Sequence, residues 1–297
     1  MVNRIDVSST ALEKSIELAR DFLEKLVFPP AEELGLLLRD HVALWRFKNQ
    51  VSVLNKAKSY CEQKGISPQL ISPKLLCPLL EGSSLEADPS LQDRWAILLS
   101  NMVDSEKNVQ NHVFPYVLGQ MSLVEFEFLE QVVRDKKERV RALTVDLEQF
   151  RAERPAIQDA LAARLAELSE EIEQLRELGS SRWNADIWKV SAKKSTTDRE
   201  IAMLDLRERS LLRALSAPQL VPESGLKEFE LSNIIRLGLV RTVYATRAEA
   251  QSLEIPNDPR KEYLTVDFEV DLESSSEHFL TELGEMFIDA CSDDRGA

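Results

Sequence analysis

The chain has 297 residues and a formal net charge of −14, from 37 Lys and Arg against 51 Asp and Glu. This acidity disfavours a general nucleic-acid coat, because a polyanion repels a protein surface of the same sign. Hydrophobic residues make up 43% of the chain, which is enough for a buried core, so a disordered chain is excluded. With 30% charged residues and only 9 Gly and 12 Pro, the composition favours a mostly α-helical fold.

The sequence predicts neither secretion nor a membrane span. Its longest apolar runs, such as residues 36–38 and 96–99, are far shorter than the roughly 20 residues that cross a bilayer. The amino-terminal segment has charges inside its apolar stretch, unlike a signal peptide. Cys61, Cys77 and Cys291 form no CxxC pair, and we interpret them as buried thiols. We therefore expect a cytoplasmic protein.

Residues 1–121 are predicted to form an N-terminal helical domain. An apolar face at helical spacing predicts an amphipathic helix over residues 12–28, which the two following prolines end. A second helix is predicted over residues 31–63, with Gly65 as its C-terminal breaker.

Helix start and stop signals define the rest of this domain. Residues 72–85 are expected to be helical but broken by Pro78. Asp88 followed by Pro89 predicts a helix start, with an N-cap and then proline at the first helical position. A further short helix is predicted over residues 108–118.

Residues 122–180 are predicted to form an antiparallel helical hairpin with coiled-coil-like packing. Ser122 and Glu125 have the spacing of a capping box, and a break around Arg154 and Pro155 would separate two arms of the hairpin. The apolar stripe of the second arm is the predicted oligomer or partner seam, formed by Leu161, Leu165, Leu168, Ile172 and Leu175. The alternative is that both arms lie flat on the body as ordinary amphipathic helices.

Residues 181–297 are predicted to form a connector and a winged-helix-like α+β module. Residues 182–195 are expected to be irregular, and Thr197 and Glu200 form a second capping box that opens a helix. The later elements are predicted as a helix over 223–237, a strand over 239–245, a polar wing loop over 246–259, a strand over 263–271 and a last helix carrying Phe279, Leu280, Leu283, Phe287 and Ile288.

Several blocks of the sequence resemble a known family. Residues 31–51, AEELGLLLRDHVALWRFKNQV, resemble the opening signature of the Abi-alpha family, a bacterial group linked to abortive phage infection. Further similar blocks follow in the expected order at residues 64–68, 73–81, 91–101, 235–240 and 280–291. The resemblance implies phage defence, and it brings no set of catalytic residues with it.

The sequence has none of the motifs that would predict catalysis, a cofactor or a metal. No Arg lies five to seven positions before His41, His112 or His278, the spacing sought for abortive-infection ribonucleases. HExxH, GxxxxGK[ST], GxGxxG and GxSxG are absent as well. We therefore predict no catalytic, cofactor-binding or metal-binding residues, and we expect the protein not to be an enzyme.

A basic, aromatic stretch over residues 39–58 leaves one nucleic-acid alternative open. It has a local charge of +4, and Arg39, Trp45, Arg46 and Lys48 are its candidate RNA contacts. The competing interpretation is a core helix whose cations pair with acids elsewhere. The predicted C-terminal module is acidic, which disfavours DNA binding there.

The leading hypothesis is a cytoplasmic, non-enzymatic phage-defence protein. We expect it to act through protein contacts, either as a homo-oligomer or with a host or phage protein. The alternative is a nucleic-acid-directed effector that uses the stretch over residues 39–58.

Overall fold

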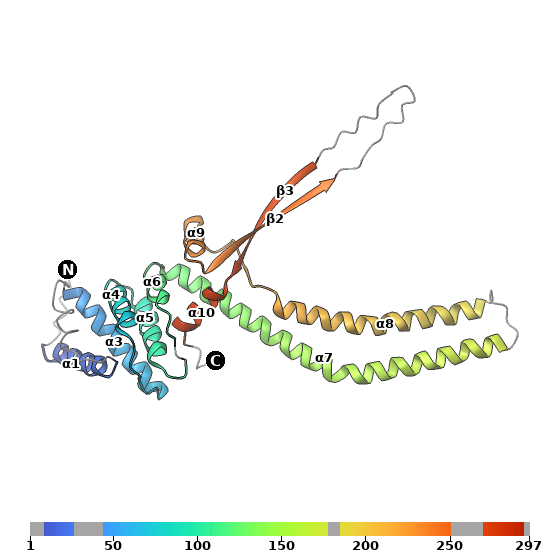
Figure 1. Ribbon diagram of the computed structural model, residues 1–297, viewed down its shortest axis with the longest axis horizontal. Helices are drawn as coiled ribbons and strands as arrows, with labels where there is room; N and C mark the ends of the chain where they lie inside the picture. Colours follow the sequence, from blue (N-terminus) through green and yellow to red (C-terminus); the bar gives the residue numbers. More distant parts are fainter. Residues whose placement is uncertain (1–8, 27–43, 108, 178–184, 251–269, 294–297) are drawn as a thin grey trace, which may run out of the picture. The chain divides into compact units, whose positions relative to one another are not determined.

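The computed structural model describes residues 9–26, 44–107, 109–177, 185–250 and 270–293 (Figure 1). The chain divides into two compact units. The first combines Met1–Val133 with Leu220–Ala297, and the second is Arg134–Gln219.

The amino-terminal part of the first unit consists of short packed helices. They are α1 (Ser9–Leu26), α3 (Leu44–Lys64), α4 (Pro73–Ser84), α5 (Pro89–Val103) and α6 (Val113–Leu118). Helix α3 packs against α1, α4 and α5, and the fully buried Trp95 of α5 lies in the core. The amphipathic helix predicted over residues 12–28 is confirmed as α1, with Ala19 and Phe22 buried.

Local chemistry explains where these helices begin and end. The Asp88 carboxylate accepts the backbone N–H groups of Ser90 and Leu91 at 2.7 and 3.2 Å, so the predicted N-cap of α5 is confirmed. Gly65 follows α3 with a φ of 65°, a left-handed conformation that glycine adopts without strain.

The predicted break at Pro78 is wrong, because α4 continues through it. Pro78 lacks the N–H that would bond the carbonyl four residues earlier. It lies on the exposed side of α4, where water can satisfy that carbonyl. The helix predicted from residue 31 is described only from Leu44 onward, as α3.

The carboxyl-terminal part of the first unit adds a small antiparallel sheet and two helices. They are β1 (Leu220–Val221), α9 (Glu228–Arg236), β2 (Val240–Ala250), β3 (Val270–Leu280) and α10 (Glu282–Cys291). The strand order is β1-β3-β2, and β2 pairs with β3 from Val240↔Leu280 to Ala250↔Val270. Phe287 of α10 packs edge-on against two phenylalanines, Phe114 and Phe126, so α10 shares a core with the amino-terminal helices.

Three boundaries in this region differ from prediction. Phe279 and Leu280 belong to β3 and not to the last helix, because Thr281 caps α10 by accepting the Gly284 N–H. Residues 246–250 pair with β3 and are not a wing loop. Helix α9 begins at Glu228, five residues later than predicted. The remainder of the predicted wing loop and most of the strand over 263–271 lie outside the described residues.

The second unit contains most of α7 (Leu123–Glu177) and all of α8 (Ala185–Ser216). The capping box of α7 is confirmed, since the Glu125 carboxylate accepts the Ser122 N–H at 2.7 Å and the Ser122 hydroxyl accepts the Glu125 N–H at 3.3 Å. The predicted break around Arg154 and Pro155 is wrong, because α7 is continuous through Pro155. The two predicted arms are therefore one helix, and the antiparallel partner of α7 is α8.

The predictions for the start of α8 are also wrong. Residues 185–195, expected to be an irregular connector, are helical. Thr197 is not an N-cap: it is buried within α8, and its hydroxyl donates to the Lys193 carbonyl at 3.1 Å. Across the described residues the predicted fold class, mostly α with an α+β module at the carboxyl-terminal end, is confirmed, and the β part is a three-stranded antiparallel sheet. The winged-helix likeness stays a prediction.

Candidate functional site

The predicted seam lies between α7 and α8. Leu168 and Ile172 of α7 form a small buried cluster with Val190 of α8, and Leu175 packs against it. Leu161 and Leu165 are half-buried on the same face of α7. The structure thus brings all five seam residues onto one stripe, and α8 of the same chain covers its centre. Their role in binding another molecule stays a prediction.

Charged groups hold the two helices together beside Pro155. Arg154 binds both Asp205 and Glu208 of α8, and the Arg151 Nε donates to Glu208 at 2.9 Å. The missing backbone hydrogen bond at Pro155 is therefore offset by contacts across the helix pair. The Arg207 guanidinium lies 4.9 Å from the Phe150 ring centroid, which adds a cation–π contact between the helices.

A second set of contacts lies where α8 ends. The Arg139 guanidinium donates to the Ala214 and Ala217 carbonyls at 2.7 and 2.9 Å and to the Gln219 side chain at 3.2 Å. These bonds satisfy carbonyl groups at the C-terminus of α8, where a helix has no internal donors left. The helix pair is thus fastened at its end as well as at its centre.

The face of α8 that points away from α7, its outer face, is apolar and is not covered by other residues of its unit. Trp188, Met203 and Leu206 are 60%, 59% and 53% exposed. Trp188 and Leu206 are five full turns apart, and the buried Thr197 lies midway between them on the other side of the helix. The predicted connector over residues 182–195 does not extend the helix back to Trp188, so it does not include this face. The helical spacing of these three apolar residues is the signal that could have found it.

In the described part of the basic stretch, residues 44–58, three cations make contacts within their own unit: Arg46, Lys56 and Lys58. The Arg46 guanidinium donates to the Ser84 hydroxyl at 3.1 and 3.2 Å. Lys48 is exposed. Arg39 lies outside the described residues, and Trp45 lies in α3 with a side chain that the structure does not describe. The four predicted RNA contacts are therefore not brought together into one described surface.

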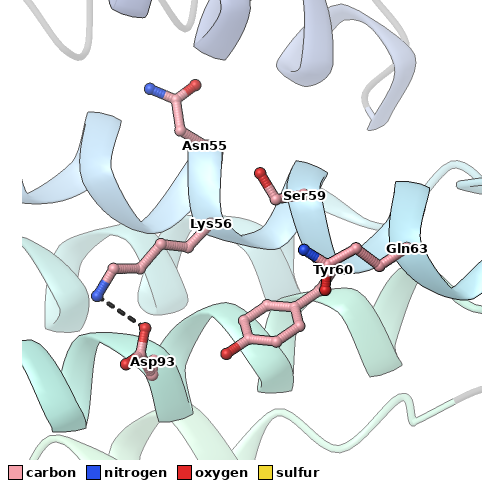
Figure 2. A pocket seen from close by; sticks show the side chains of 6 residues that line it. All are labelled: Asn55, Lys56, Ser59, Tyr60, Gln63 and Asp93. Carbon is pink, nitrogen blue, oxygen red and sulfur yellow. Dashed lines mark ion pairs between the residues drawn. The ribbon is translucent and has the colours of Figure 1, made fainter.

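A shallow groove of about 380 Å³ is lined by residues of α3 and by Asp93 of α5. Its lining residues are Asn55, Lys56, Ser59, Tyr60, Gln63 and Asp93. Figure 2 shows Lys56 and Asp93 pointing toward one another on the side where Tyr60 lies, whereas Asn55 points away from them.

Ion pairing within the groove satisfies its charged groups. The Lys56 ammonium lies 2.7 Å from the Asp93 carboxylate and also donates to the Pro89 carbonyl at 3.1 Å. Burial, together with the negative charges of Asp93 and Asp293, raises the pKa of the Tyr60 hydroxyl. Tyr60 therefore stays protonated at neutral pH, and its pKa is displaced in the direction unsuited to a general base.

The cysteine thiols are held in the neutral form. Cys61 and Cys291 are buried as predicted, whereas Cys77 is half-buried. Burial raises the pKa of Cys61 to about 11 and raises that of Cys291 further. Burial and the Glu81 carboxylate raise the pKa of Cys77. A thiol must ionise to act as a nucleophile or metal ligand, so these environments oppose both roles.

Within the described ranges, no three His, Cys, Asp or Glu side chains converge to hold a metal ion. None of the described helices is both long and apolar enough to cross a membrane.

Comparison with known families gives a match over most of the chain. A family model described as abortive infection alpha matches residues 48–291, which is well over half of the chain. The searches of curated proteins and of solved structures give no match.

Proposed function

Since the chain belongs to the abortive infection alpha family, we propose that it is a cytoplasmic phage-defence protein that acts through protein contacts of the α7–α8 pair. Catalysis has no part in this proposal. The predicted seam would hold the pair in shape, and the opposite face of α8 would meet the partner.

The observation that carries the proposal is the exposed apolar face of α8. Three large apolar side chains on one helix face are costly to leave in water, and such patches mark protein-binding sites more often than isolated apolar residues do. Tryptophan in particular is enriched among the residues that dominate binding energy.

The test is phage challenge of cells that produce the chain. Met203→Gln and Trp188→Gln should each remove most of the protection, measured as phage plating efficiency. Each would place an unpaired amide where the partner would otherwise bury an apolar side chain. Met286→Gln is the matched control: Met286 lies in α10 of the first unit and is 52% exposed, close to the 59% of Met203. Protection that survives both substitutions on α8, with normal protein levels, would overturn the proposal.

The nucleic-acid alternative is tested on the purified chain. Light scattering with absorbance at 260 and 280 nm measures mass and bound nucleic acid together. We expect nucleic-acid-free protein. Salt-labile absorbance at 260 nm that is lost in Arg46→Glu would favour the RNA-directed alternative instead.

A further inference from the structure

The outer face of α8 is basic as well as apolar. It contains Trp188, Arg199, Met203, Leu206 and Arg213, which all fall within about a quarter of the helix circumference at 3.6 residues per turn. All five are exposed. Among the described residues, neither arginine of this face makes an ion pair. These cations are therefore available to a partner.

The outer face of α7 has the opposite character. It contains Val145, Ala152, Asp159, Ala163 and Glu170, which also share one narrow stripe and are all exposed. Glu177 continues the stripe one heptad after Glu170. This face combines small side chains with carboxylates, whereas the outer face of α8 combines large side chains with guanidinium groups.

We propose that the partner of the outer face of α8 is the outer face of α7 in a second copy of this chain. The proposal rests on the function proposed above and identifies the partner. Large side chains of α8 would fill the space left by the alanines of α7, and Arg199 and Arg213 would meet Asp159 and Glu170 of the second copy.

Charge and symmetry favour this arrangement over its alternative. Pairing α8 with α8 would place arginines against arginines, and like charges at an interface cost several kcal/mol. Pairing α8 with α7 joins two different surfaces, so one copy of the joined pair keeps a free α7 face and the other keeps a free α8 face. Such a head-to-tail contact adds further copies until a ring closes or a filament forms.

The experiment exchanges the charges of the two faces in the full chain. One variant combines Arg199→Glu with Arg213→Glu, a second combines Asp159→Arg with Glu170→Arg, and a third has all four substitutions. Light scattering against concentration measures association. Each pair of substitutions alone should lower the apparent association constant at least about tenfold, because like charges then face each other.

Association should be recovered in two further samples. In an equimolar mixture of the first two variants each reversed face meets a complementary one, and in the third variant both faces are reversed together. Recovery in the third variant also shows that the substitutions do not unfold the helix pair. Salt at 500 mM should weaken association of the unchanged chain, because the charges are at the surface.

Three outcomes would overturn the proposal. The first is a wild-type chain that stays monomeric at all concentrations. The second is an Asp159→Arg, Glu170→Arg variant that associates like wild type, which would indicate α8–α8 pairing. The third is an equimolar mixture that fails to recover association. If Met203→Gln nevertheless abolishes protection from phage, the proposed function stands and the partner is a different protein.

Discussion

At the residue scale, Gly284 is required for close packing at the start of α10. A Cβ added there would lie 2.4 Å from the Leu239 carbonyl oxygen, a backbone atom that cannot rotate away. Gly284→Ala should therefore lower the free energy of unfolding by about 1–3 kcal/mol, measured by urea denaturation.

Gly119→Ala is the control for this substitution. Its Cβ would approach the nearest atom, the Pro115 carbonyl oxygen, only to 3.4 Å, and the backbone of Gly119 is already α-helical. The stability of this variant should stay within about 0.5 kcal/mol of wild type. Equal urea midpoints for the two variants would contradict the packing argument.

Because its pKa is raised in the fold, Cys61 should make the free energy of unfolding fall as pH becomes alkaline. Its pKa is raised to about 11 by burial, above the roughly 8.5 of an exposed thiol in the unfolded chain. The folded state therefore holds a proton that the unfolded state releases. This contribution to stability is complete below about pH 8.5 and is lost as pH rises toward 11.

The measurement is the urea midpoint between pH 8 and 10.5. Cys61→Ala lowers stability at every pH because it leaves a cavity, but its stability should fall less steeply with pH. Parallel slopes for the two proteins would show that Cys61 does not contribute.

At the scale of single elements, α5 depends on its N-cap. Asp88→Ala removes the acceptor of two backbone N–H groups and should cost about 1 kcal/mol. Asp88→Asn keeps a side-chain oxygen acceptor and should retain most of the stability. Thermal unfolding compares the three proteins, and a Tm of Asp88→Asn as low as that of Asp88→Ala would argue against capping.

The α7–α8 pair depends on Arg154. Arg154→Ala leaves Asp205 without its partner on α7 and should destabilise the pair by about 1 kcal/mol, since these contacts are partly exposed. Hydrogen exchange of α8 amides reports the effect.

Arg176→Ala provides the comparison for Arg154→Ala. Arg176 pairs with Glu173 within α7 and both side chains are exposed, so little change in exchange is expected. If both variants exchange alike, the contacts of Arg154 do not hold α8 in place.

At the scale of the whole molecule, the negative charge is concentrated in one unit. Residues 134–219 contain 17 Lys and Arg against 16 Asp and Glu, a net charge of +1. Since the whole chain has a net charge of −14, the first unit has a net charge of −15. Like charges on one compact unit repel each other, and dissolved salt screens that repulsion.

Salt should therefore act on the two units in opposite directions. Raising NaCl from about 20 to 500 mM should slow hydrogen exchange of α5 amides in the first unit, because self-repulsion weakens. The same change should speed exchange of α8 amides in the second unit, because it screens the ion pairs of Arg151 and Arg154. Uniform slowing in both units would contradict this division of charge.

The sequence signals whose structural predictions are confirmed are local. Asp88 before Pro89, the capping box of Ser122 and Glu125, and the apolar face of α1 each involve residues within a few turns, so neighbouring residues determine the structure. The same holds for the stripe from Leu161 to Leu175, whose common face follows from helical spacing.

Contacts between distant residues decided the rest. Pro155 is a helix breaker by local rules, but Arg154 binds Asp205 and Glu208, which lie 51 and 54 residues later in the chain, and α7 continues through Pro155. Thr197 and Glu200 have the spacing of a capping box, yet α8 begins at Ala185, and Thr197 is buried within this longer helix.

The sequence by itself determined helical class, acidity, several helix ends and the family, because composition and short-range spacing are sufficient for these. Only the tertiary structure decided that α8 is the partner of α7 and that one face of α8 stays exposed. The physical reason is that burial and contacts between helices depend on which distant residues come together in space. The spacing of residues along the chain does not determine this.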